Sequence, residues 1–178
     1  IGKVFAAQGF GYLVGSQVAG HLYDRGGGHR VLTGGLTALS LAFIAVPAAS
    51  TLLGLAGLFS IIGFGAATMD VGCNSMLVWS RGQAVGRMIG ALHLCFGLGA
   101  LVAPVISRIS LSIGDDLWLA CIAIGSFGLL VAASAARFEA PAHRGQTAHR
   151  TDSGQRAAWV VIAAAGVWFL LYVGIEVG

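Results

Sequence analysis

Six apolar stretches, each close to the length of a helix that crosses a lipid bilayer, constrain this chain more than any other feature. They lie at about residues 4–22, 31–48, 53–78, 87–107, 117–136 and 157–178. Crossing the hydrocarbon core takes about 20 apolar residues, and a backbone inside lipid must satisfy its own hydrogen bonds. The sequence therefore predicts an all-α, polytopic membrane protein.

The charge content argues against a water-soluble fold. Only 10% of the residues are Asp, Glu, Lys or Arg, whereas a soluble domain carries about a quarter. The basic residues behind the net charge of +3 lie in the gaps between the apolar stretches. Because they form no single patch, we expect the lipid bilayer and not nucleic acid as a partner.

The basic residues also predict an orientation. Eight of the ten Lys and Arg residues lie in or beside the gaps near 24–30, 80–86 and 137–156. Loops on the cytoplasmic side of a membrane carry an excess of Lys and Arg. We therefore expect a multi-pass protein of the cell membrane with these three loops in the cytoplasm.

The ends of the chain suggest an internal piece of a longer protein. Ile1 and Gly178 both lie inside apolar stretches. The longest gap, 137–156, contains Pro141 and Gly145 among charged residues, a composition typical of a linker. We expect a domain boundary there.

The first gap carries a charged motif that resembles the signature of the major facilitator superfamily, roughly G-x-x-x-D-R-x-G-x-x-R. The matching positions are Gly20, Asp24, Arg25, Gly27 and Arg30. In that family the motif joins transmembrane helices 2 and 3 and acts as a cytoplasmic gate. The resemblance therefore implies a gating role for these five residues.

The same resemblance implies a partial major facilitator fold, with six of about twelve transmembrane helices. Residues 1–136 would be the N-terminal bundle without its first helix (helices 2–6). Residues 137–156 would be the cytoplasmic linker between the two bundles, and residues 157–178 would be helix 7.

An acid interrupts the third apolar stretch. Asp70 lies nine residues before Trp79, about 13 Å along a helix and close to mid-membrane. An ionised carboxylate is costly there unless it faces a cavity. Asn74 is one turn further on and shares its face. The pair could handle a proton or grip hydroxyl groups, although a structural polar pair between helices is the alternative.

This pattern, the run 92–104 and the segment 172–176 resemble one branch of the superfamily. That branch contains the fucose–proton symporter and the sodium-dependent glucose transporter-like proteins. In the symporter, an acid of helix 4 that matches Asp70 takes part in sugar and proton handling. The resemblance implies the following substrate-binding or ion-binding candidates: Asp70, Asn74, His93, Tyr172 and Glu176.

Two further polar features have more ordinary interpretations. A single histidine in a membrane helix, such as His93, more often forms an interhelical hydrogen bond than part of a proton relay. Gln8, Tyr12 and Ser16 form a polar stripe at i, i+4 and i+8. We predict that this stripe serves helix packing.

The favoured function is secondary active transport of a small polar solute, with a sugar preferred, coupled to a proton or sodium gradient. Proton-coupled efflux of drugs or other amphipathic solutes is the alternative, and a membrane scaffold without transport is a third hypothesis. We expect no enzyme, because no nucleophile–base pair appears in the sequence. No cofactor or metal site is expected either.

Overall fold

The computed structural model describes residues 1–25, 28–81, 85–114 and 116–137, with side chains at 80 and 81 excepted. The predicted linker, apart from Arg137, and the predicted helix at 157–178 lie outside these residues. The described residues belong to one compact unit.

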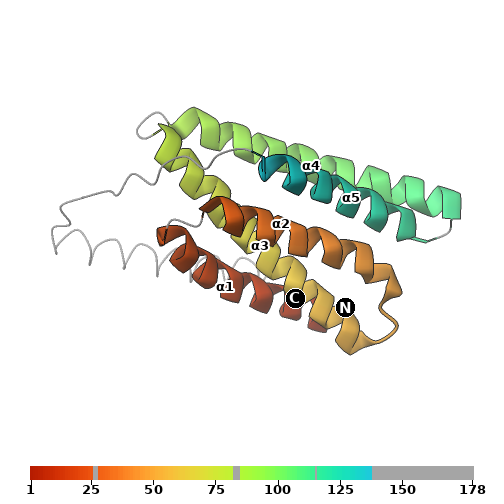
Figure 1. Ribbon diagram of the computed structural model, residues 1–178. Helices are drawn as coiled ribbons and strands as arrows, with labels where there is room; N and C mark the ends of the chain where they lie inside the picture. Colours follow the sequence, from red (N-terminus) through yellow and green to blue (C-terminus); the bar gives the residue numbers. More distant parts are fainter. Residues whose placement is uncertain (26–27, 82–84, 115, 138–178) are drawn as a thin grey trace. The chain divides into compact units, whose positions relative to one another are not determined.

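Five long α-helices make up this unit, and its described residues contain no β-strand (Figure 1). A short 3-10 turn, η1, follows α2 and includes Pro47. The elements run in the order α1 (Gly2–Asp24), α2 (Gly28–Ala45), η1 (Val46–Ala48), α3 (Leu52–Arg81), α4 (Gly86–Gly114) and α5 (Trp118–Ala135). Each helix covers one predicted apolar stretch, which confirms the all-α fold.

Four helical segments are long and apolar enough to cross a membrane. They are Gly28–Ala48, Leu52–Trp79, Gly86–Gly114 and Trp118–Ala135. The helix α1 is not among them, although it is 23 residues long. Its apolar residues alternate with glycines and with Gln8, Ser16 and Gln17. Such a composition suits a helix with one face on protein or water instead of lipid.

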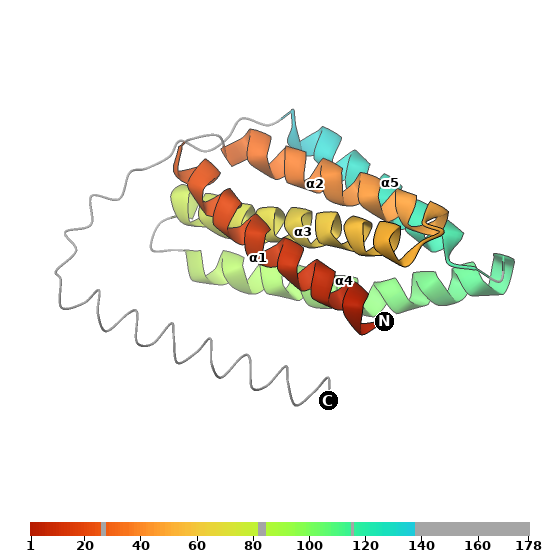
Figure 2. The ribbon, with the colours of Figure 1, turned by 90° about the horizontal axis from the view of Figure 1, so that it is seen from below.

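The helix α3 is the centre of the packing. It lies against α1 on one side and α2 on another, and α5 packs against α2 (Figure 2). The helix α4 touches α5 and little else, so most of its side chains are exposed.

Glycines bring α1 and α3 into near backbone contact. A Cβ atom on Gly11 would lie 2.0 Å from the carbonyl oxygen of Ser60, and one on Gly63 would lie 2.0 Å from that of Gln8. No side chain fits at either position. Close approach through small residues is the usual way in which membrane helices associate, since lipid gives helices no hydrophobic reason to pair. The two glycines therefore fix the register of α1 against α3.

The contact between α2 and α5 has the same basis. A Cβ atom on Gly125 would lie 2.8 Å from the Ser40 carbonyl oxygen, and one on Gly128 would lie 2.2 Å from the Ser40 hydroxyl. Ser40 is fully buried there, and its hydroxyl donates to the Leu36 carbonyl. The small side chains of both helices set their spacing.

This packing predicts a difference between two glycines of α3. Gly63→Ala should destabilise the full-length protein by about 1–3 kcal/mol, because the new methyl group overlaps α1. Gly57→Ala should not destabilise it, because a Cβ atom there meets nothing within 4 Å. Thermal unfolding of both variants in the same detergent measures the effect. Equal stability of the two would show that α1 and α3 are not in close contact.

Candidate functional site

The parallel contact of α1 and α3 brings a tyrosine onto the acid of α3. The Tyr12 hydroxyl donates to Asp70 Oδ2 at 2.8 Å. Asn74 Nδ2 donates to Asp70 Oδ1 at 3.0 Å and to the Asp70 carbonyl oxygen at 2.9 Å. Each carboxylate oxygen of Asp70 thus accepts one hydrogen bond. We call Tyr12, Asp70 and Asn74 the Asp70 cluster.

The cluster lies in the interior of a membrane-spanning helix. Asp70 is 18 residues after Leu52 and 11 before Arg81, or about 27 Å and 16 Å along the helix axis. A polar group at such a depth has no lipid headgroup within reach. It is therefore stable only beside protein or water.

The described helices leave the cluster open. Asp70 is exposed, Tyr12 is 41% exposed and Asn74 is half-buried. A carboxylate that is both deep in the membrane and open on one side must face either further protein or a polar cavity, because lipid contact would cost several kcal/mol. The cluster therefore marks the polar face of the α1–α3 pair.

The geometry leaves binding capacity at the cluster. Each carboxylate oxygen of Asp70 has a lone pair beyond the one that its hydrogen bond uses, and Asn74 donates through its nitrogen, so its Oδ1 is free to accept. Carboxylate and amide oxygens are suitable ligands for a hard cation and suitable acceptors for a hydroxyl group. The cluster can take up a proton, a cation or a sugar hydroxyl.

Tyr12 is the member of the Asp70 cluster that the sequence pattern assigned to packing. The polar stripe of Gln8, Tyr12 and Ser16 was predicted to serve packing. Gln8 does lie at the α1–α3 contact, and the Ser16 hydroxyl donates within its own helix to the Leu13 carbonyl. The Tyr12 hydroxyl reaches across to Asp70 instead. The sequence of the stripe does not reveal that α1 pairs with α3. Without that pairing, the residue that bonds to Asp70 cannot be told from the residues that pack.

The remaining binding candidates are not brought into the cluster. His93 is exposed on α4, and within the described residues no hydrogen bond joins it to Asp70. Tyr172 and Glu176 lie outside the described residues. Among the residues that are described, no group of three or more His, Cys, Asp or Glu side chains could hold a metal ion.

The predicted gate residues lie at the turn between α1 and α2. Asp24 is the last residue of α1 and Arg25 follows it, while Arg30 is in the first turn of α2. All three side chains are exposed. A Cβ atom on Gly20 would meet nothing within 4 Å, and Gly27 lies outside the described residues. The gating role of these residues remains a prediction.

A buried tyrosine anchors this turn. Tyr23 is only 1% exposed, and its hydroxyl donates to the Thr68 carbonyl of α3 at 3.2 Å. Its ring lies edge-on against Trp79 at a centroid distance of 6.3 Å. These contacts hold the end of α1 on α3, so Asp24 and Arg25 start from a fixed position.

Comparison with known proteins identifies the family. Residues 1–177 match the model of the Major Facilitator Superfamily, and the chain belongs to this superfamily. It is therefore part of a multi-pass membrane protein, and its family points to solute transport and not to an enzyme.

The chain is also similar to proteins named sodium-dependent glucose transporter 1. The protein of Xenopus laevis is 30% identical over 111 residues, which are 62% of this chain and 23% of that protein. The human protein is 30% identical over 108 residues, or 61% and 21% of the two lengths. The rat protein is 32% identical over 111 residues, or 62% and 23%. The chain thus matches less than a quarter of each of these relatives, and no solved structure matches it significantly.

The cluster predicts a specific role for the Tyr12 hydroxyl. In the full-length protein, Tyr12→Phe should lower gradient-driven solute uptake about tenfold, because a hydrogen bond to a charged group contributes about 1.5 kcal/mol. Ser16→Ala, one turn along the same stripe, should stay within about twofold of wild type, since its hydroxyl serves only α1. Uptake into proteoliposomes with matched protein amounts measures both. Similar uptake rates for the two variants would indicate that Tyr12 serves only helix packing.

Proposed function

We propose that this chain is part of a secondary active transporter of a small polar solute, coupled to a proton or sodium gradient. A sugar is the preferred solute. The observation that carries the proposal is the Asp70 carboxylate, which lies deep in α3, is open on one side and is held by Tyr12 and Asn74.

The cluster suits ion coupling because the Asp70 carboxylate can exist in two states, charged without an ion and neutralised with one. An empty carboxylate deep in the membrane is stabilised by its two hydrogen bonds, and a bound proton or sodium ion neutralises it. Transporters of this kind alternate between two orientations of their helical bundles around a shared central site. A charge that disappears on ion binding changes the relative free energy of those orientations, which links the ion to the movement.

The preference for a sugar rests on the donor and acceptor set and on the relatives. A carboxylate beside an amide can accept from and donate to neighbouring hydroxyl groups, of which a sugar carries several on adjacent carbons. The similar proteins from Xenopus laevis, human and rat are named as sodium-dependent glucose transporters. Those names favour sodium as the coupling ion and a hexose as the first solute to test.

Two other hypotheses use the same fold. Proton-coupled efflux of amphipathic solutes also employs a membrane-embedded acid, but the amide and phenol at the cluster are more polar than such solutes require. A scaffold without transport has no use for a carboxylate inside α3. The free-energy cost of placing that charge in the membrane would then bring no functional benefit. We therefore place both behind sugar transport.

The proposal includes an orientation. The turns near 24–30 and 80–86 and the linker 137–156 lie in the cytoplasm, since these segments carry most of the basic residues. Gly20, Asp24, Arg25, Gly27 and Arg30 form the cytoplasmic gate between α1 and α2. Tyr23 supports this role, because it fixes the position of the charged turn on α3.

The two ends of α4 test the orientation. In a full-length protein without its natural cysteines, Gly114→Cys should react with a membrane-impermeant maleimide added to intact cells. Gly86→Cys should react only after the cells are opened, because the basic end of α4 lies inside. The two sites are the first and last residues of one helix, so each controls for the other. The reverse labelling pattern would invert the proposed topology.

The coupling role of Asp70 has a direct test. Asp70→Asn keeps the size of the side chain but can neither release a proton nor neutralise sodium. In the full-length protein it should abolish uptake driven by an ion gradient. Exchange of labelled for unlabelled solute should partly survive, since exchange requires binding and movement but no net release of the ion.

Separate pH and sodium gradients across proteoliposomes, with glucose and other hexoses as solutes, identify the coupling ion in the same experiment. Asp116→Asn is a matched control, because Asp116 is exposed at a helix end and its Oδ1 caps the Trp118 amide, which an asparagine oxygen can also do. Persistence of gradient-driven uptake in Asp70→Asn would make Asp70 a structural residue.

A further inference from the structure

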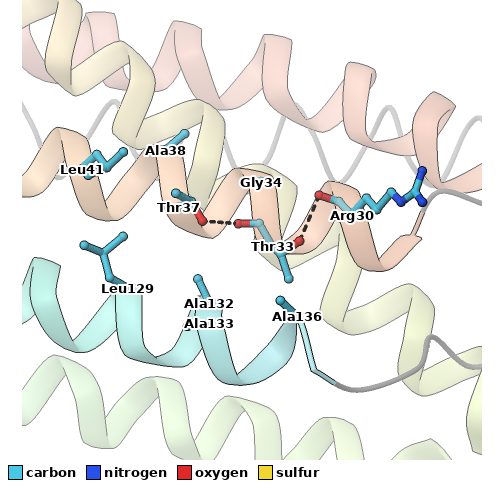
Figure 3. Close-up of a pocket in the computed structure, with 10 residues that line it drawn as sticks. All are labelled: Arg30, Thr33, Gly34, Thr37, Ala38, Leu41, Leu129, Ala132, Ala133 and Ala136. Carbon is cyan, nitrogen blue, oxygen red and sulfur yellow. Dashed lines mark hydrogen bonds between the residues drawn. The ribbon is translucent and has the colours of Figure 1, made fainter.

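An open groove of about 780 Å³ runs between α2 and α5, away from the Asp70 cluster (Figure 3). One wall comes from α2 and the other from α5. The lining residues are Arg30, Thr33, Gly34, Thr37, Ala38, Leu41, Leu129, Ala132, Ala133 and Ala136. Its size falls within the range of about 300–1,000 Å³ that is typical of ligand sites.

The walls of the groove are effectively apolar. Two threonines are the only uncharged polar side chains among the lining residues, and both hydroxyls are already bonded to their own helix. Thr33 donates to the His29 and Arg30 carbonyls at 2.8 and 3.2 Å, and Thr37 donates to the Thr33 carbonyl at 2.7 Å. The groove therefore offers its occupant methyl and methylene contacts and no free hydroxyl.

The groove has one charged end. Arg30 is the only charged lining residue, and it lies where α2 begins, whereas Leu41 and Leu129 line the opposite end (Figure 3). Directly after α5, Ala136 lines the charged end, and the exposed Arg137 follows it. His29 Nε2 donates to the Ala135 carbonyl. This bond satisfies one carbonyl at the negative end of α5. Arg30, Arg137 and the positive amino-terminal end of α2 give the opening its positive character.

The length of the groove matches one leaflet of a bilayer. Arg30 and Leu41 are eleven residues apart on α2, a rise of about 16 Å. Half of a hydrocarbon core is about 15 Å thick. An occupant with its anionic group at Arg30 would therefore end near mid-membrane, which is the reach of a single acyl chain.

We propose that the groove between α2 and α5 binds an anionic phospholipid of the leaflet in which α2 begins. Its phosphate group pairs with Arg30, with Arg137 nearby, and one acyl chain lies between the two helices as far as Leu41 and Leu129. Basic openings between transmembrane helices are suited to such headgroups, and the lipid fills the space that the small side chains of Gly34, Ala38 and Ala133 leave. The site would hold α2 and α5 together. It includes none of the Asp70 cluster residues and shares Arg30 with the proposed cytoplasmic gate.

The structure supplies variants that fill the groove without disturbing the backbone. Gly34 lines it, and a Cβ atom there meets nothing within 4 Å. Gly34→Leu should therefore project into the acyl-chain position, and the exposed Ala133→Leu should do so from the opposite wall. Gly57→Leu is the matched control, since Gly57 is exposed on α3, meets nothing within 4 Å and does not line the groove.

The experiment exposes the full-length protein to equal amounts of phosphatidylglycerol and phosphatidylcholine with identical acyl chains, and then counts retained lipids by native mass spectrometry. Wild type and Gly57→Leu should retain one phosphatidylglycerol preferentially. Gly34→Leu and Ala133→Leu should lose it, with elution profile and helical content unchanged. Arg30→Gln should lower the preference for phosphatidylglycerol about fivefold, the effect expected for one arginine near a phosphate, and Arg30→Lys should restore part of it.

Three outcomes would overturn the proposal. Retention of phosphatidylglycerol by both groove-filling variants would show that the lipid binds outside the groove. An unchanged preference in Arg30→Gln would show that the headgroup lies elsewhere. Displacement of the lipid by millimolar inorganic phosphate would show an anion site in which the acyl chain contributes nothing.

Discussion

The close contact of α1 with α3 is the interaction on which the rest of this structure depends. Lipid surrounds both helices with material as apolar as their own side chains, so hydrophobic burial cannot select a partner. Direct contact between backbones can select a partner, because it requires glycine at matched positions on both helices. Gly11 faces Ser60 and Gly63 faces Gln8, with no room for a side chain at either glycine. A shift of one residue in either helix would replace these glycines with bulkier neighbours.

The position of the polar groups follows from that register. Tyr12 is adjacent to Gly11 and extends along α3 to the Asp70 carboxylate, while Tyr23, three turns further on, bonds to the Thr68 carbonyl. One contact thus places the open cluster deep in the membrane and the charged turn at the helix end. The two features lie on the same rigid pair of helices. A movement of this pair would carry the Asp70 carboxylate, our proposed ion site, and the proposed gate together, as rocking of whole bundles requires.

The open polar cluster and the apolar groove of this structure lie on different helix pairs. The helix α1, which carries Gln8, Tyr12 and Ser16, is the described long helix that is not apolar enough to cross a membrane by composition alone. The helices α2 and α5 present threonines with satisfied hydroxyls and small apolar residues along their shared groove. Polar atoms with free lone pairs concentrate at the cluster, whereas those beside the groove bond to their own backbone. This contrast is expected if one side meets water and solute and the other meets lipid.

The sequence by itself determined the helices and the family. Runs of about twenty apolar residues have one stable backbone conformation in lipid, so the limits of the five described helices could be predicted within about three residues, except that α4 extends to Gly114 and not to residue 107. The 20–30 motif identified the superfamily that the comparison confirms. It also selected Asp70 and Asn74, because a carboxylate inside an apolar run is conspicuous and residues at i and i+4 share a face.

Only the tertiary structure decided that Tyr12 completes the cluster, that His93 stands apart from it and that α2 and α5 form a groove. Those facts depend on which helices are neighbours and in what register, and the choice is made by contacts between residues some 50 to 100 positions apart, such as Tyr12 with Asp70 and His29 with Ala135. No periodicity within a single helix encodes such a pairing.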